Sequence, residues 1–230
     1  YPVSQYKRKK TRKSMDFFSF PKWTNFVPPA LAIFLVIGSS YAATLLYLGG
    51  SPRTTDVGYM PKQPVEYSHA LHAGDLGIDC RYCHNTVEHA AQASIPPTQT
   101  CMNCHKTIRA NSQKLIPIQE SYATGNPVKW VRVHDLPDYV YFNHSAHVTR
   151  GVGCVSCHGR IDKMDVVYQA ETLSMGWCLD CHRNPEPHLR PAGFITQLDW
   201  QPEGDPVALG KELRQKHNIN PSTDCSTCHR

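Results

Sequence analysis

Hydrophobic residues are spread very unevenly along this chain of 230 residues. No charged residue occurs between Lys22 and Arg53, and the run from Pro29 to Leu48 is almost entirely apolar. At 1.5 Å per helical residue, such a run of about 20 residues crosses roughly 30 Å of hydrocarbon. The prolines at its start suit the first turn of a helix, where a missing N–H costs nothing. The pattern therefore predicts a transmembrane helix within residues 23–52.

The rest of the chain offers little for a conventional core. After Arg53 the aliphatic and aromatic residues Leu, Ile, Val and Phe are scarce, whereas the chain as a whole contains 18 Pro and 14 Gly. Apolar residues make up 40% of the sequence, below the usual level of about 45–50%. This composition excludes a large β-sandwich, a parallel α/β sheet and a Rossmann enzyme. A polypeptide so poor in aliphatic side chains needs disulfides, metals or a cofactor to supply burial.

Charge distinguishes the N-terminal tail from the remainder. Residues 1–22 hold seven Lys and Arg against one acidic residue, whereas from Arg53 onward 17 basic residues face 18 acidic ones. Basic residues ahead of a membrane helix place that end in the cytoplasm, so the part after Arg53 is expected outside. The small residues at 40–43 leave a cleaved signal peptide as the alternative. The long basic lead-in and apolar run favour a retained anchor, and the confined charge does not favour nucleic-acid binding.

The ten cysteines form five pairs, and histidine follows each pair directly. This is the attachment signature of c-type haem: the two thiols bind the porphyrin vinyl groups, and the histidine is the proximal iron ligand. The five copies are Cys80-Arg-Tyr-Cys83-His84, Cys101-Met-Asn-Cys104-His105, Cys154-Val-Ser-Cys157-His158, Cys178-Leu-Asp-Cys181-His182 and Cys225-Ser-Thr-Cys228-His229.

Two other arrangements of these cysteines are possible. The 17 residues between Cys83 and Cys101, and the 20 between Cys157 and Cys178, fit the spacing of zinc ribbons. Local disulfides would suit an oxidising compartment. Neither requires a histidine after every pair, and the fifth pair has no partner for a ribbon. The sequence therefore predicts five covalently bound c-type haems.

Eight further histidines and two methionines are available as distal ligands. The pattern Tyr67-Ser-His69-Ala-Leu-His72 recurs as Phe142-Asn-His144-Ser-Ala-His147, each ahead of two haem motifs, which indicates a repeat of about 75 residues. Histidines three apart on a helical turn can reach two neighbouring irons. The predicted distal ligands are His69, His72, His134, His144 and His147, with Met164 and Met175 as alternatives and His89, His188 and His217 expected at the surface.

The expected fold is a multihaem cytochrome c, with short α-helices and irregular coil wrapped around five haems and one N-terminal transmembrane helix. The expected segments are a basic cytoplasmic tail, a transmembrane anchor, a first dihaem repeat, a second dihaem repeat and a C-terminal segment with the fifth haem. Their ranges are 1–22, 23–52, 53–125, 126–190 and 191–230.

The two repeats resemble the class III multihaem cytochromes c. Together with the basic tail, the anchor, the run Leu173-Ser-Met-Gly-Trp-Cys178 and the terminal motif beginning at Cys225, they resemble the membrane-anchored pentahaem subunit of bacterial alternative complex III. The resemblance implies a complex of a respiratory or photosynthetic chain that oxidises quinol in the membrane. It implies an integral-membrane quinol-binding subunit and an iron–sulfur subunit as partners, with a soluble electron carrier as acceptor.

We therefore expect an electron-transfer subunit that is not an enzyme by itself. It would be a single-pass protein of the cell (inner) membrane with a periplasmic haem domain, in contact with lipid and without nucleic acid. The carrier would be a cytochrome c, a cupredoxin or an iron–sulfur protein. Because haem propionates would make the ectodomain acidic, we expect the carrier to dock through a basic face. One alternative is a multihaem enzyme with an open-site haem; another is a self-sufficient membrane-anchored quinol dehydrogenase.

Overall fold

The computed structural model describes residues 19–49 and 55–229. The chain forms two compact units, Tyr1–Gly50 and Ser51–Arg230. Most of the predicted basic tail, including its clustered Lys and Arg residues, lies outside the described residues. The predicted boundaries between the two repeats and the C-terminal segment lie inside the second unit and stay predictions.

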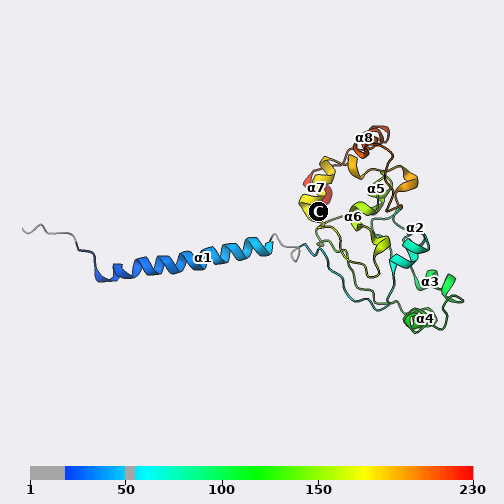
Figure 1. The fold of residues 1–230 in the computed structure, drawn as a ribbon, viewed down its shortest axis with the longest axis horizontal. Coiled ribbons are helices and arrows are strands. Elements are labelled where there is room, and N and C mark those ends of the chain that lie inside the picture. Colours follow the sequence, from blue (N-terminus) through cyan, green and yellow to red (C-terminus); the bar gives the residue numbers. More distant parts are fainter. Residues whose placement is uncertain (1–18, 50–54, 230) are drawn as a thin grey trace, which may run out of the picture. The chain divides into compact units, whose positions relative to one another are not determined.

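The first unit consists of a 3-10 turn, η1 (Lys22–Phe26), continued by the helix α1 (Val27–Gly49) (Figure 1). Pro28 and Pro29 lie in the first turn of α1, as the sequence predicts. Among the described residues, one helix, Lys22–Gly49 with a mean hydropathy of 2.0, is long and apolar enough to cross a membrane. Such a helix fits a membrane anchor, and it also fits a signal sequence.

The second unit is built from short helices joined by irregular coil (Figure 1). Its longest helix has 11 residues, and its described residues contain no strand beyond the isolated bridges Val140 to His229 and Val152 to Leu189. This confirms the expected mixture of short helix and coil. The elements are η2 (Ala70–Asp75, π-helical), α2 (Cys80–Cys83), α3 (Thr98–His105), η3 (Gln113–Leu115), α4 (Ile116–Thr124), α5 (His144–Val148), α6 (Val155–His158), η4 (Ile161–Lys163), α7 (Met175–Arg183), η5 (Glu186–His188), η6 (Ala192–Phe194), α8 (Pro206–Lys216) and α9 (Cys225–Cys228).

A short helix presents each of the five cysteine motifs. Local capping explains why some of these helices begin where they do. The Asp79 carboxylate accepts a hydrogen bond from the Arg81 backbone N–H at 2.8 Å, and the Ser174 hydroxyl accepts one from Trp177 N–H at 3.3 Å. Such side-chain caps satisfy backbone donors that a first turn leaves unpaired.

Few apolar side chains are buried in the second unit. Six of the nine buried apolar side chains form two small clusters, Val65 with Met102 and Ile118, and Leu189 with Leu213 and Ile219. No described side chain falls below 2% exposure. The thin core expected from composition is therefore present, and the protein chain alone encloses little apolar volume.

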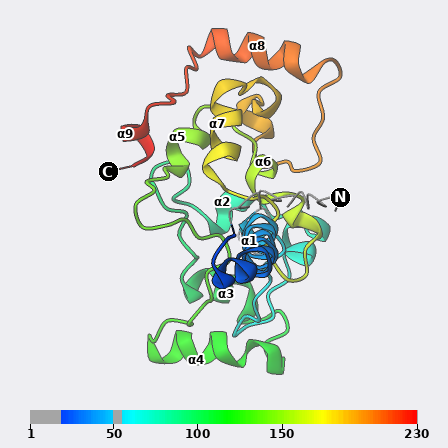
Figure 2. The same ribbon diagram turned by 90° about the vertical axis from the view of Figure 1, so that its left-hand side faces the viewer.

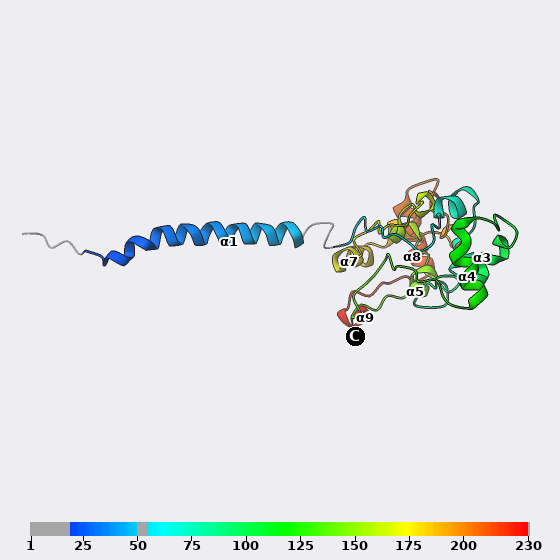
Figure 3. The ribbon, with the colours of Figure 1, turned by 90° about the horizontal axis from the view of Figure 1, so that it is seen from below.

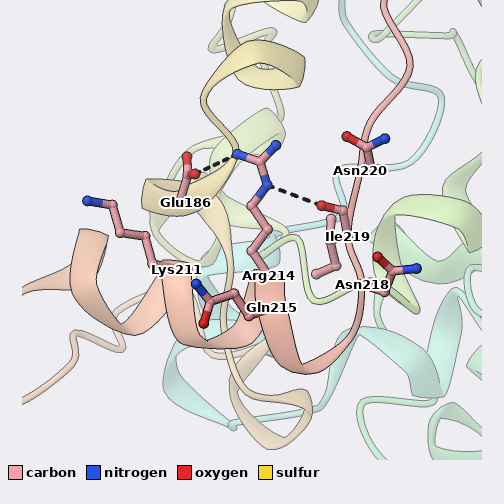
Figure 4. Close-up of a pocket in the computed structure, with 7 residues that line it drawn as sticks. All are labelled: Glu186, Lys211, Arg214, Gln215, Asn218, Ile219 and Asn220. Atoms are coloured by element: carbon pink, nitrogen blue, oxygen red, sulfur yellow. Dashed lines mark hydrogen bonds and ion pairs between the residues drawn. The ribbon is translucent and has the colours of Figure 1, made fainter.

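Helix α8 fixes the segment that leads to the last motif. Arg214 on α8 donates from Nη1 to the Glu186 carboxylate at 2.6 Å and from Nε to the Ile219 carbonyl at 3.2 Å (Figure 4). Gly210 lies so close to η5 that a Cβ there would overlap the Glu186 backbone carbonyl. The lack of a side chain at Gly210 thus permits α8 to pack on η5, and Arg214 ties the outgoing chain to both.

This packing predicts that Gly210→Ala weakens the attachment of α8. Forcing the helix and η5 apart should cost about 1–3 kcal/mol, which for a domain of this size lowers the unfolding midpoint by roughly 2–4 °C per kcal/mol. Thermal unfolding of the haem-loaded chain measures the effect. Gly204→Ala is the matched control, because a Cβ at Gly204 meets open space. Equal midpoints for the two variants would contradict the close approach.

Candidate functional site

All ten cysteines lie within the residues that the structure describes, and each is an unpaired thiol, so the structure contains no local disulfide. Within residues 19–49 and 55–229, no three His, Cys, Asp or Glu side chains gather closely enough to hold a metal ion. The described structure therefore contains neither the zinc ribbon nor the disulfides that the spacing alone permits.

The two histidine repeats fold in the same way. Tyr67 stacks on His72 with ring centres 4.4 Å apart and meets His69 edge-on at 4.8 Å. In the second copy Phe142 stacks on His147 at 4.5 Å and meets His144 edge-on at 4.7 Å. The same local geometry at positions 75 residues apart supports the internal duplication. The sequence analysis assigned no role to Tyr67 and Phe142, although each stands two positions before the first histidine of its repeat.

Histidines from different segments face one another at a regular spacing. The ring centres of His72 and His105 lie 6.2 Å apart, and those of His147 and His182 lie 6.1 Å apart. The ring centres of His144 and of His158, one of the five motif histidines, lie 6.5 Å apart, and the two ring planes are nearly parallel. A metal–imidazole bond is about 2 Å long, so two rings on opposite sides of one metal ion have centres roughly 6 Å apart.

Backbone carbonyls orient most of these rings. A carbonyl only accepts hydrogen bonds, so a ring nitrogen bonded to it carries the proton and the other nitrogen is left as a metal ligand. Nδ1 makes this bond in four of the five motif histidines and in three predicted distal ligands. The carbonyl partners are Ser94 for His84 (2.9 Å), Ile108 for His105 (2.9 Å), Ser222 for His182 (2.6 Å), Tyr139 for His229 (3.2 Å), Ser68 for His72 (2.8 Å), Ala91 for His144 (2.9 Å) and Asn143 for His147 (2.7 Å).

Three other imidazole nitrogens are buried without a hydrogen-bond partner: His69 Nδ1, His134 Nε2 and His158 Nδ1. Burial lowers the pKa of His69 to about 4 and that of His158 to about 3, so both rings stay neutral at physiological pH. Neutral imidazole is the form that binds iron. Unsatisfied buried nitrogens, paired rings at metal-spanning distances and a thin core together fit c-type haems bound at these motifs.

Two predicted ligands have less regular surroundings. His134 lies 4.5 Å from His158 and nearly perpendicular to it, which is too close for one iron to fit between the rings. His229 of the last motif faces the ring of Tyr139 at 5.8 Å, and no histidine ring contact of His229 is found among the described residues. Of the two histidines near His158, His144 is thus the one at a metal-spanning distance, and within residues 19–49 and 55–229 no histidine ring lies opposite His229.

The remaining candidates differ in exposure. His89 and His217 are exposed, whereas His188 is half-buried. Met164 is only 4% exposed and packs near Gly159, while Met175 is 67% exposed on α7. Met175 lies one turn before Cys178 and thus on the same side of α7. Its thioether therefore stays available to a haem bound beside that helix.

The paired rings predict that His147→Ala removes one distal ligand. The iron held by His182 should then become high-spin or shift strongly in potential, because an imidazole is lost from its sixth position. Electron paramagnetic resonance with a redox titration measures both changes. His217→Ala is the control, since its ring is exposed and should leave spectrum and potentials unchanged. Indistinguishable variants would refute the assignment of His147.

Comparison with known proteins agrees with this geometry. The family described as cytochrome c7 and related cytochrome c matches residues 140–230, which hold the last three motifs. The multihaem cytochrome c subunit of menaquinone reductase from Nitratidesulfovibrio vulgaris (strain Hildenborough) is 30% identical over 149 residues, which cover 56% of this chain and 70% of that protein. The motifs, the paired histidines and this similarity show that the chain belongs to the multihaem cytochrome c family.

Proposed function

We propose that the chain is the electron-transfer subunit of a membrane quinol:acceptor oxidoreductase of the alternative complex III kind. The pairing of histidine rings at 6.1–6.5 Å carries this proposal. Where two imidazoles bind one iron, they would close the axial sites that substrate chemistry needs and leave a group suited to one-electron transfer. Five covalently bound haems would supply that chemistry, and the chain's own side chains orient them and exclude water.

Two further observations support a link to membrane quinone. The relative from N. vulgaris is named as a subunit of a menaquinone reductase, and the helix Lys22–Gly49 is apolar enough to hold the chain in the membrane. The name of the relative describes reduction of a quinone, whereas the resemblance to alternative complex III implies oxidation of a quinol. An electron-transfer subunit serves either direction, because its potentials and partners decide which way electrons flow.

The first test of the proposal is the haem content. A pyridine haemochrome assay with protein quantitation should give five c-type haems per chain that resist acid–acetone extraction, because each motif offers two thiols and a proximal histidine. Four or fewer haems, or bound zinc, would contradict it.

A second candidate function rests on His229, which faces Tyr139 instead of another histidine. An iron held there with an open sixth position could bind a small substrate, as in multihaem enzymes. A high-spin ferric signal that shifts when nitrite is added to the same haem-loaded sample would favour this function over electron transfer alone.

The proposed role also requires other subunits for quinol chemistry. Quinol oxidation releases protons and normally uses an ionisable group, and residues 23–52 contain no acid, base or histidine. The purified chain in lipid should exchange electrons with small mediators, yet show negligible quinol oxidation or quinone reduction until integral-membrane and iron–sulfur subunits are added. Inhibitor-sensitive turnover by the chain alone would favour a self-sufficient quinol dehydrogenase.

A further inference from the structure

The five motifs do not follow one another in space as they do in sequence. The second motif contacts the first, because the side-chain amide of Asn103 donates to the Tyr82 hydroxyl at 3.2 Å, and each residue lies between the two cysteines of its motif. The first contacts the third through residues 195–196. Thr196 donates to the Asp79 carboxylate at 2.8 Å, and the Ile195 carbonyl accepts from Cys154 N–H at 3.0 Å.

The remaining neighbours follow from α5 and from the C-terminal segment. His144 and His147, on the single turn of α5, face His158 of the third motif and His182 of the fourth. His182 in turn donates to the carbonyl of Ser222, which lies three residues before Cys225 of the fifth motif. The motifs therefore form an unbranched line in the order second, first, third, fourth, fifth. Figures 2 and 3 show α3 at one end of this unit and α7 with α9 toward the other.

The two ends of this line are also its exposed positions. Cys104 of the second motif and Cys225 of the fifth are exposed, whereas the other eight cysteines are partly covered. A group bound at either end is thus the most accessible to another protein. A group bound at the first, third or fourth motif has further motifs on both sides.

Charge separates the two ends. Residues 98–132, which include α3 and α4, hold five Lys and Arg against one acidic residue, whereas residues 199–229 hold three against five. Lys114 pairs with Glu66 and Arg132 with Asp135. The three other basic side chains are exposed and have no ion pair within the described part of the chain: Lys106, Arg109 and Lys129. Lys106 lies over the Tyr122 ring of α4 at 5.3 Å, which holds it at this surface.

We propose that the α3–α4 end is the docking surface for an acidic soluble electron carrier. This deepens the proposed function, on which it rests, by assigning the end and the charge of the partner. Exposed charges without ion-pair partners attract an oppositely charged protein from a distance. Such attraction suits a brief, salt-sensitive encounter. The net charge of the whole ectodomain led us to expect a basic carrier. We propose an acidic one here because the local charge at the α3–α4 end is positive.

The test compares two double charge reversals in the full-length, haem-loaded chain in detergent. Lys106→Glu with Lys129→Glu changes the docking surface. The matched control, Lys163→Glu with Lys216→Glu, makes the same change in net charge at exposed positions outside this surface. The probe is a plant-type [2Fe–2S] ferredoxin, an acidic carrier, and its Kd is measured calorimetrically at low and high salt. Haem content and redox titrations accompany every variant.

Binding should weaken by roughly tenfold or more in the first variant, with a shallower salt dependence, and by less than about twofold in the control. Unchanged haem content and potentials would show that the loss concerns docking and leaves the proposed function standing. Equal losses in both variants would overturn the proposal, since net charge alone would then explain them. No binding of the acidic probe by the unmodified chain, or tighter binding of a basic cytochrome c at the same surface, would also overturn it.

Discussion

The fold depends on holding imidazole rings in pairs at about the separation that one metal ion spans. His72 with His105, and His147 with His182, meet this requirement although each pair joins separate helices. Backbone carbonyls complete the arrangement, because a bond to Nδ1 fixes both the ring plane and the free nitrogen. The bond between His182 and the Ser222 carbonyl also joins the segment just before the fifth motif to the fourth motif.

Chain packing alone supplies little of the remaining stability. The two small apolar clusters lie away from one another in sequence, around Ile118 and around Leu213. Beside the second cluster, the ion pair of Arg214 with Glu186 at 2.6 Å ties α8 to η5. Covalent haems provide what is missing, because each combines a large apolar surface with two cross-links to the chain. The buried ring nitrogens of His69 and His134 agree with bound haem, because the chain without haem leaves them with no hydrogen-bond partner.

The proposed arrangement would let one chain serve separate partners. Chemistry at the membrane needs protonatable groups that the apolar helix lacks, so that helix is suited to holding the protein in place. The linear order of motifs leaves two accessible ends, and the basic residues around α3 and α4 make those ends electrostatically different. In the proposed complex, a carrier and a neighbouring subunit would approach different ends and would not compete for one surface.

Much of this could be predicted from the sequence, since the features involved are local. A cysteine pair followed by histidine, an uncharged apolar run and a scarcity of aliphatic residues are each visible within short windows. The short helices and thin core follow from them, as does the equivalence of His69 and His144. Which motif histidine each of them faces could not be predicted, because this depends on the path that the irregular segments take between the motifs.

Only the tertiary structure separated His144, which faces His158 at 6.5 Å, from His134, which lies too close to it. Only the tertiary structure set the first motif between the second and the third, through Tyr82 and Thr196. The reason is physical: motif spacing fixes which atoms can hold a haem, whereas neighbours in space are chosen by single hydrogen bonds between segments that lie up to 117 residues apart.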